Sequence, residues 1–175
     1  LAPNTAREDY VLSVGRVENR KNTLKLIEAC HQLGYKLILI GGYDSKDEYT
    51  KRCLDLVEQY DFEHIDNIDQ EALLPYYYRA KVHAMVSWYE TPGLATMEAA
   101  CGGCNILTTD RGSVREYFGD KATYCDPFSQ ESIVAGLKLS MERKIDTSLR
   151  DLILEKYTWE KAAAQTKDAY VELLS

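Results

Sequence analysis

Short apolar runs alternate with segments of helical periodicity along almost the whole chain. Runs such as Tyr10–Val14 and Lys36–Ile40 begin or end at a glycine or a charge, and each is typical of a buried parallel strand. Between these two runs, apolar side chains recur at helical spacing, at Leu24, Ile27, Cys30 and Leu33. Strands that alternate with helices predict an α/β fold, with a doubly wound parallel sheet and helices on both of its faces.

The same patterns place the individual elements. About six strands are expected, at residues 10–14, 36–40, 62–65, 82–86, 105–108 and 122–125. Helices are expected at residues 24–33, 45–60, 70–79, 94–101, 114–118, 130–143, 147–155 and 159–173. Ser45 and Glu48 resemble a capping box at the start of the second helix. The chain has 175 residues, 45% of them apolar, which is enough to bury one sizeable core, so residues 1–175 are expected to form one domain.

Composition excludes several classes of partner. The net charge of −7 argues against a surface for nucleic acid or anionic membrane. No apolar run approaches the roughly 20 residues that a membrane-spanning helix needs, and no charged-then-apolar leader is recognisable. The five cysteines are odd in number and lack the spacing of a disulfide framework, which predicts a reducing, cytoplasmic location.

Cys101 and Cys104 are two thiols at a spacing that can bind a metal or form a redox disulfide. A second such pair is missing, and the histidines at positions 31, 64 and 83 are scattered without ligand spacing. We therefore expect structural cysteines and no metal site.

Two glutamates, Glu90 and Glu98, bracket a Pro-Gly pair that ends one strand and begins the next helix. Glu90 is then expected in the loop and Glu98 two turns inside the helix. Backbone amides at a helix N-terminus attract phosphate, and here they belong to Gly93, Leu94 and Ala95. A carboxylate accepts hydrogen bonds from hydroxyl groups. Such carboxylates beside an anion site suit a ligand that is part sugar and part phosphate. The alternative is a solvated helix start where the dipole favours acidic residues.

Cations follow the first strand within one loop. Arg16 and Lys21 lie where the ends of parallel strands bind ligands, so both could reach a diphosphate held at the Gly93 helix terminus. In the alternative interpretation they form surface pairs with Glu18 or Glu28.

Longer stretches around these residues resemble a known family. Seven residues separate Glu90 from Glu98, and the run from Glu98 to Glu116 continues without a gap, with Gly103, Asp110, Gly112 and Glu116 in register. This resembles the Glu-x7-Glu motif of retaining glycosyltransferases of family 4, also called group 1, which have the GT-B fold. A second family signature, strand-Gly-Arg-x4-Lys-Asn, is similar to the segment at residues 11–16 followed by Lys21-Asn22.

The resemblance implies a function and a role for each matching residue. The substrate would be a nucleoside-diphosphate sugar, with no cofactor and no metal, and a hexosyl group would pass to an acceptor sugar or lipid-linked glycan. Arg16 and Lys21 would bind the diphosphate and stabilise it as it leaves. Glu98 would accept hydrogen bonds from the ribose hydroxyls, and Glu90 would face the donor sugar. The backbone at Gly15, Gly93, Leu94 and Ala95 would complete the donor site.

The resemblance also implies a domain organisation. Members have two Rossmann-like domains, and the C-terminal one binds most of the donor. This chain matches only that half of a GT-B fold. Residues 1–8 are therefore expected to be a linker remnant, residues 159–173 a closing helix, and the N-terminal acceptor domain to be absent. The chain alone should then be inactive, and membrane contact would come only through the missing half.

Two other functions remain open. A glycoside hydrolase could use Glu90 and Glu98 as acid and nucleophile, but this leaves Arg16 and Lys21 without a role. A non-catalytic nucleotide-binding module is also possible. The first strand-helix turn, Gly15-Arg16-Val17-Glu18, lacks the Gly-x-Gly-x-x-Gly fingerprint, which argues against NAD.

Overall fold

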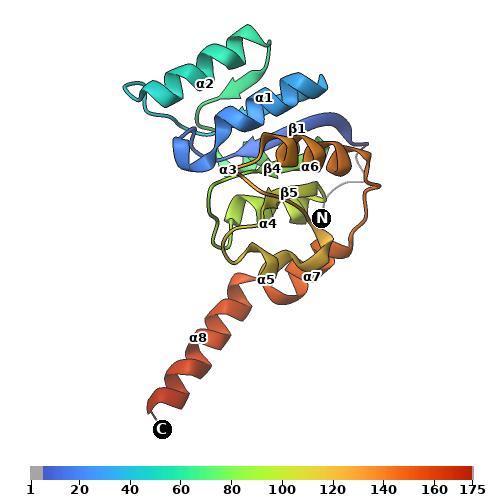
Figure 1. Cartoon of the computed structure of the whole chain (residues 1–175). Coiled ribbons are helices and arrows are strands. Elements are labelled where there is room, and N and C mark those ends of the chain that lie inside the picture. The colour runs from blue at the N-terminus through green and yellow to red at the C-terminus, as the bar shows by residue number, and fades with distance from the viewer. Residues whose placement is uncertain (1–5, 175) are drawn as a thin grey trace.

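The computed structural model describes residues 6–174 and contains one six-stranded parallel sheet (Figure 1). Its strands, in chain order, are β1 Glu8–Val14, β2 Lys36–Ile40, β3 Glu63–Ile65, β4 Ala80–Met85, β5 Asn105–Thr109 and β6 Thr123–Cys125. The spatial order is β3-β2-β1-β4-β5-β6. This is the order of the doubly wound nucleotide-binding folds, so the predicted Rossmann-like sheet is confirmed.

Within residues 6–174, eight α-helices connect and follow the strands. They are α1 Thr23–Leu33, α2 Glu48–Gln59, α3 Gln70–Arg79, α4 Leu94–Gly102, α5 Val114–Phe118, α6 Gln130–Glu142, α7 Ser148–Lys156 and α8 Trp159–Leu174. Two 3₁₀ turns, η1 Asn19–Lys21 and η2 Gly119–Lys121, lie between them. The predicted helices are all present, with ends that differ by a few residues.

The helices cover both faces of the sheet, as the alternation of strands and helices predicts. Along β1, Val11 packs in one core cluster with α1, α2 and α6, whereas Leu12 packs in the other with α3, α4, α5 and α7. Neighbouring residues of a strand point to opposite faces, so a nearly continuous apolar run supplies both clusters. Both layers rest on strands that are buried from either side.

Two sequence-based expectations about local structure concern the start of α2 and the first residues of the chain. Asp47, and not Ser45, caps α2, because its carboxylate accepts from the Thr50 amide at 3.0 Å. The predicted capping box at Ser45 was therefore wrong. Most of the predicted linker at residues 1–8 lies outside the described residues, and β1 already includes Glu8.

Helix α8 extends away from the body of the domain (Figure 1), and all of its described side chains are exposed. Its apolar residues include Trp159, Tyr170 and Leu173, each more than half exposed. No described helix is long and apolar enough to cross a bilayer.

Candidate functional site

The candidate site lies where the strand order reverses, between the carboxyl ends of β1 and β4. In open α/β sheets this crevice is the usual place for a ligand. Here the loop after β1 carries Gly15, Arg16 and Lys21, and the loop after β4 carries Glu90 and leads into α4. The fold thus brings together two segments that the sequence separates by more than sixty residues.

Glu90 is the charged centre of this crevice, with a side chain only 6% exposed. Its Oε1 lies 2.6 Å from Lys21 Nζ, and the Ser87 hydroxyl donates to the same oxygen at 2.7 Å. Arg20 Nη1 lies 3.8 Å away. A buried carboxylate needs such donors, because burial without them would strongly disfavour its charge.

The two predicted cations have different surroundings. Lys21 is mostly buried against Glu90, whereas Arg16 is exposed and forms none of the ion pairs found in residues 6–174. The alternative pairing was wrong for both cations, because Glu18 pairs with Arg20 and Glu28 pairs with Arg52.

Helix α4 begins beside this ion pair. Gly93 is its N-cap residue, and the first helical hydrogen bonds run from the Thr96 and Met97 amides to the Gly93 carbonyl. The amides of residues 93–95 precede these bonds, so they form the N-terminal end of the helix dipole. A Cβ placed on Gly93 would lie 3.9 Å from Glu90 Oε2, and one placed on Gly15 would lie 3.7 Å from Lys21 Cε. Four predicted residues therefore adjoin one another: Gly15, Lys21, Glu90 and Gly93.

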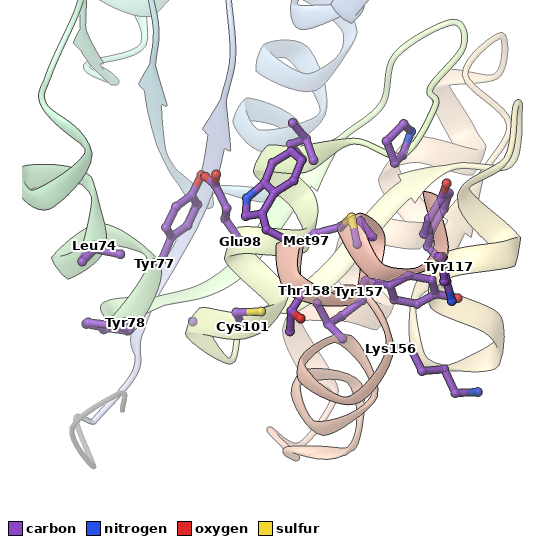
Figure 2. Close-up of a pocket in the computed structure, with 17 residues that line it drawn as sticks. Leu74, Tyr77, Tyr78, Met97, Glu98, Cys101, Tyr117, Lys156, Tyr157 and Thr158 are labelled. Carbon is purple, nitrogen blue, oxygen red and sulfur yellow. The ribbon is translucent and has the colours of Figure 1, made fainter. Parts of the chain in front are cut away.

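Glu98 lies further along α4 and is exposed. Its Oε2 accepts a hydrogen bond from the Tyr77 hydroxyl of α3 at 3.1 Å. Both residues line a cavity of about 660 Å³ between α3, α4 and the helices at the C-terminal end. Figure 2 shows the Tyr77 ring and the Glu98 carboxylate pointing toward one another at this cavity. Burial, followed by the Glu98 charge, raises the pKa of Tyr77, so this hydroxyl stays protonated and donates.

Two framework residues were not assigned a role from sequence. Asn22 is buried, and its Nδ2 donates to the carbonyls of Val86 and Pro127 at 3.1 and 3.0 Å. It thereby joins the loop after β1 to the loops after β4 and β6. Gly112 pairs with Glu90 in an isolated β-bridge, and a Cβ on Gly112 would lie only 1.9 Å from the Glu90 carbonyl oxygen. The sequence motifs already pointed to both residues, since Asn22 belongs to the Lys21-Asn22 signature and Gly112 to the run from Glu98 to Glu116.

The cysteine pair is apart from this crevice. The Cys104 thiol is buried and donates to the Tyr77 carbonyl at 3.1 Å, and burial raises the pKa of Cys104 to about 12. Cys101 lines the cavity beside Glu98. Across the part of the chain that the structure describes, no cluster of three or more histidine, cysteine or acidic residues could hold a metal ion.

Comparison with known proteins identifies the family. Residues 3–158 match the family described as "Glycosyl transferases group 1", which is most of the chain. The chain belongs to this family. Group 1 membership agrees with the sheet order, which is that of a Rossmann-like domain of GT-B glycosyltransferases.

A curated relative supports the same assignment. The chain is 27% identical over 176 residues to "O-antigen chain mannosyltransferase B" of Escherichia coli, a match that covers 94% of this chain and 46% of that protein. The chain therefore spans about half the length of this curated relative.

Solved structures share the fold. Sucrose-phosphate synthase from Thermosynechococcus elongatus superposes with a TM-score of 0.82 at 23% identity, over 95% of this chain and 46% of that one. HepE of Anabaena, solved in complex with UDP and glucose, superposes with a TM-score of 0.80 at 15% identity, over 94% and 48%.

Proposed function

We propose that this chain is the donor-binding domain of a retaining glycosyltransferase that transfers a hexosyl group from a nucleoside-diphosphate sugar. The observation that carries the proposal is the contact of Lys21 with Glu90 at the N-terminus of α4. There a cation and the free amides of a helix terminus converge beside a buried carboxylate. The lysine and the amides bind anions, and the carboxylate accepts hydrogen bonds from hydroxyl groups. A sugar diphosphate contains both kinds of group.

Each residue has a part in the proposed reaction. Lys21 and Arg16 bind the diphosphate, and the amides of Gly93, Leu94 and Ala95 face the same charge. As the bond between the sugar and the diphosphate breaks, negative charge grows on the departing diphosphate, and fixed donors stabilise this charge without a protein nucleophile. No metal or cofactor is required for this arrangement.

The two glutamates act on different parts of the donor. Glu98 accepts hydrogen bonds from the vicinal hydroxyls of the ribose, which suit a carboxylate with several acceptor sites. Glu90 faces the donor sugar. Because Lys21 and Ser87 both contact its Oε1, Oε2 remains on the Gly93 side for a sugar hydroxyl.

This division of roles makes the hydrolase alternative less suitable. A nucleophilic carboxylate must attack carbon directly, whereas the Glu90 carboxylate already pairs with Lys21 and accepts a hydrogen bond from Ser87. HepE, which shares this fold, was solved in complex with UDP and glucose, and this supports our proposal that the present chain binds a nucleotide and a sugar.

Donor and acceptor must be held together before the barrier can fall. About half of each relative has no counterpart in this chain. We therefore propose that the corresponding part of the whole protein binds the acceptor, which would be a sugar or a lipid-linked glycan. Membrane contact, if the whole protein makes any, would come through that part. A cytoplasmic location agrees with free thiols at all five cysteines.

Calorimetric titration of the chain with UDP, GDP and ADP tests the proposal. One of the three is expected to bind, and Lys21→Ala should weaken its binding about tenfold or more. Failure of all three to bind the parent chain would overturn the proposal.

A further inference from the structure

Tyr77 and Glu98 form a pair with unequal exposure. Tyr77 is 1% exposed, whereas Glu98 is exposed on α4. The 3.1 Å bond from the Tyr77 hydroxyl is the one hydrogen bond that the Glu98 carboxylate makes within residues 6–174. A glutamate on an open helix surface samples several rotamers. The orientation of this one is set by a side chain from the core.

Tyr77 is itself held from three directions. Its carbonyl accepts from Arg7 Nη1 at 2.8 Å and from the Cys104 thiol at 3.1 Å. Its Cβ lies so close to α4 that a Cβ on Gly102 would be 2.7 Å away. The Tyr77 ring has already lost its conformational freedom during folding. Its hydroxyl can therefore orient the flexible Glu98 side chain with little further loss of conformational entropy.

The geometry also leaves part of the carboxylate free. Tyr77 contacts Glu98 Oε2, and Oε1 forms no hydrogen bond with any described residue. Both residues line the same cavity, as Figure 2 shows. A ligand that enters this cavity meets a carboxylate whose plane is already set.

We propose that Tyr77 is a positioning residue for nucleotide binding: its hydroxyl holds the Glu98 carboxylate in the orientation that accepts the ribose hydroxyls. This inference rests on the proposed function. It differs from a purely structural role, in which the bond would only join α3 to α4 and would leave ligand preference unchanged.

The test compares ribose with dideoxyribose in two variants. Tyr77→Phe removes only the hydroxyl from a ring that stays packed. Tyr10→Phe is the matched control, because Tyr10 is also buried and its hydroxyl donates to the Tyr76 carbonyl at 3.0 Å, away from Glu98. Each protein is titrated with the best-binding nucleoside diphosphate and with its 2′,3′-dideoxy form, and its thermal unfolding is recorded.

The parent chain and Tyr10→Phe should bind the ribonucleotide about tenfold or more tightly than the dideoxynucleotide. In Tyr77→Phe this preference should shrink to about threefold or less, while the dideoxynucleotide affinity stays within about twofold of the parent. In a Glu98→Ala background, Tyr77→Phe should have no further effect on either affinity.

Full ribose preference in Tyr77→Phe, with only a lower melting temperature, would overturn the inference and leave the proposed function intact. If the parent chain binds the diphosphate without preferring ribose, the role of Glu98 fails together with this inference. If the parent chain binds no nucleotide, the proposed function fails as a whole.

Discussion

Lys21 Nζ lies 2.6 Å from Glu90 Oε1, although the two residues are 69 positions apart in the sequence. The pair joins the loop after β1 to the loop before α4, across the point where the strand order reverses. Lys21 thus lies beside the α4 terminus, where we propose that the diphosphate binds, and it pairs with the buried Glu90 carboxylate. Stability and the proposed donor binding therefore share the same residues.

Lys21→Ala should destabilise the chain by about 1–3 kcal/mol, because Glu90 would remain buried with the Ser87 hydroxyl as its remaining close donor. Arg16→Ala is the matched control. Arg16 is exposed and has no ion pair among the described residues, so its replacement should change stability by no more than about 0.5 kcal/mol. Urea unfolding of both variants measures the difference, and equal losses would count against a structural role for the Lys21 contact.

Both substitutions should nevertheless weaken nucleoside-diphosphate binding about tenfold or more, since each removes a charge-assisted contact to phosphate. The expected result for Arg16→Ala is thus a binding defect without a stability defect. Calorimetry at a temperature well below unfolding separates the two effects. Parent-like affinity in both variants would sink the assignment of the diphosphate site.

His83 should make stability depend on pH. Its ring is fully buried on β4 and neither ring nitrogen has a hydrogen-bond partner in the described structure. Burial, and then the nearby Lys21 charge, lowers the pKa of His83 to about 3. The unfolded chain binds this proton near pH 6.5 and the folded chain does not. Stability from this source is therefore full above about pH 6.5 and falls as the pH drops towards 3.

As the pH falls from 7 to 5, protonation of this histidine in the unfolded chain should lower the free energy of unfolding by about 2 kcal/mol. His83→Leu should remove that part of the slope, whatever its effect at neutral pH. His31→Gln is the control, because His31 is exposed and stacks on Tyr60. Denaturant unfolding at pH 5, 6 and 7 gives the slopes. Parallel slopes for His83→Leu and the parent would refute this account of the buried ring.

Gly112→Ala should disturb the position of Glu90. Gly112 has φ +95°, and an added Cβ would lie 1.9 Å from the Glu90 carbonyl oxygen, which is backbone and cannot rotate away. Gly34→Ala is the control, since Gly34 has φ +66° with nothing within 4 Å of an added Cβ. The control should lose about 1–2 kcal/mol of stability, because alanine disfavours this backbone conformation. Gly112→Ala should lose clearly more stability and should also lose nucleotide binding. Similar losses in both variants would show that contact with Glu90 is unimportant.

Local patterns in the sequence were enough to predict the sheet. A short apolar run such as Lys36–Ile40 favours a buried strand, and the segments between such runs have helical periodicity. The start of α2 could not be chosen in the same way. Ser45 and Asp47 are both good caps, and only the backbone path puts the Asp47 carboxylate on the Thr50 amide.

The structure brings several residues of the predicted site together, whereas their contacts with one another were not foreseen. The motifs put Lys21, Glu90 and Gly93 at one edge of the sheet, and the fold brings them together. Their mutual pairing was not predicted, because it depends on the relative orientation of two loops. The bond from Tyr77 to Glu98 was missed for the same reason, since it joins two helices whose crossing no local pattern specifies.

The most direct test of the account is a crystal structure of this chain with its best-binding nucleoside diphosphate. We expect the diphosphate to lie between Lys21 Nζ and the amides of residues 93–95, with the ribose hydroxyls on the Glu98 carboxylate. A nucleotide bound elsewhere, for example along α8 with no contact to Lys21 or Glu98, would contradict the central claim.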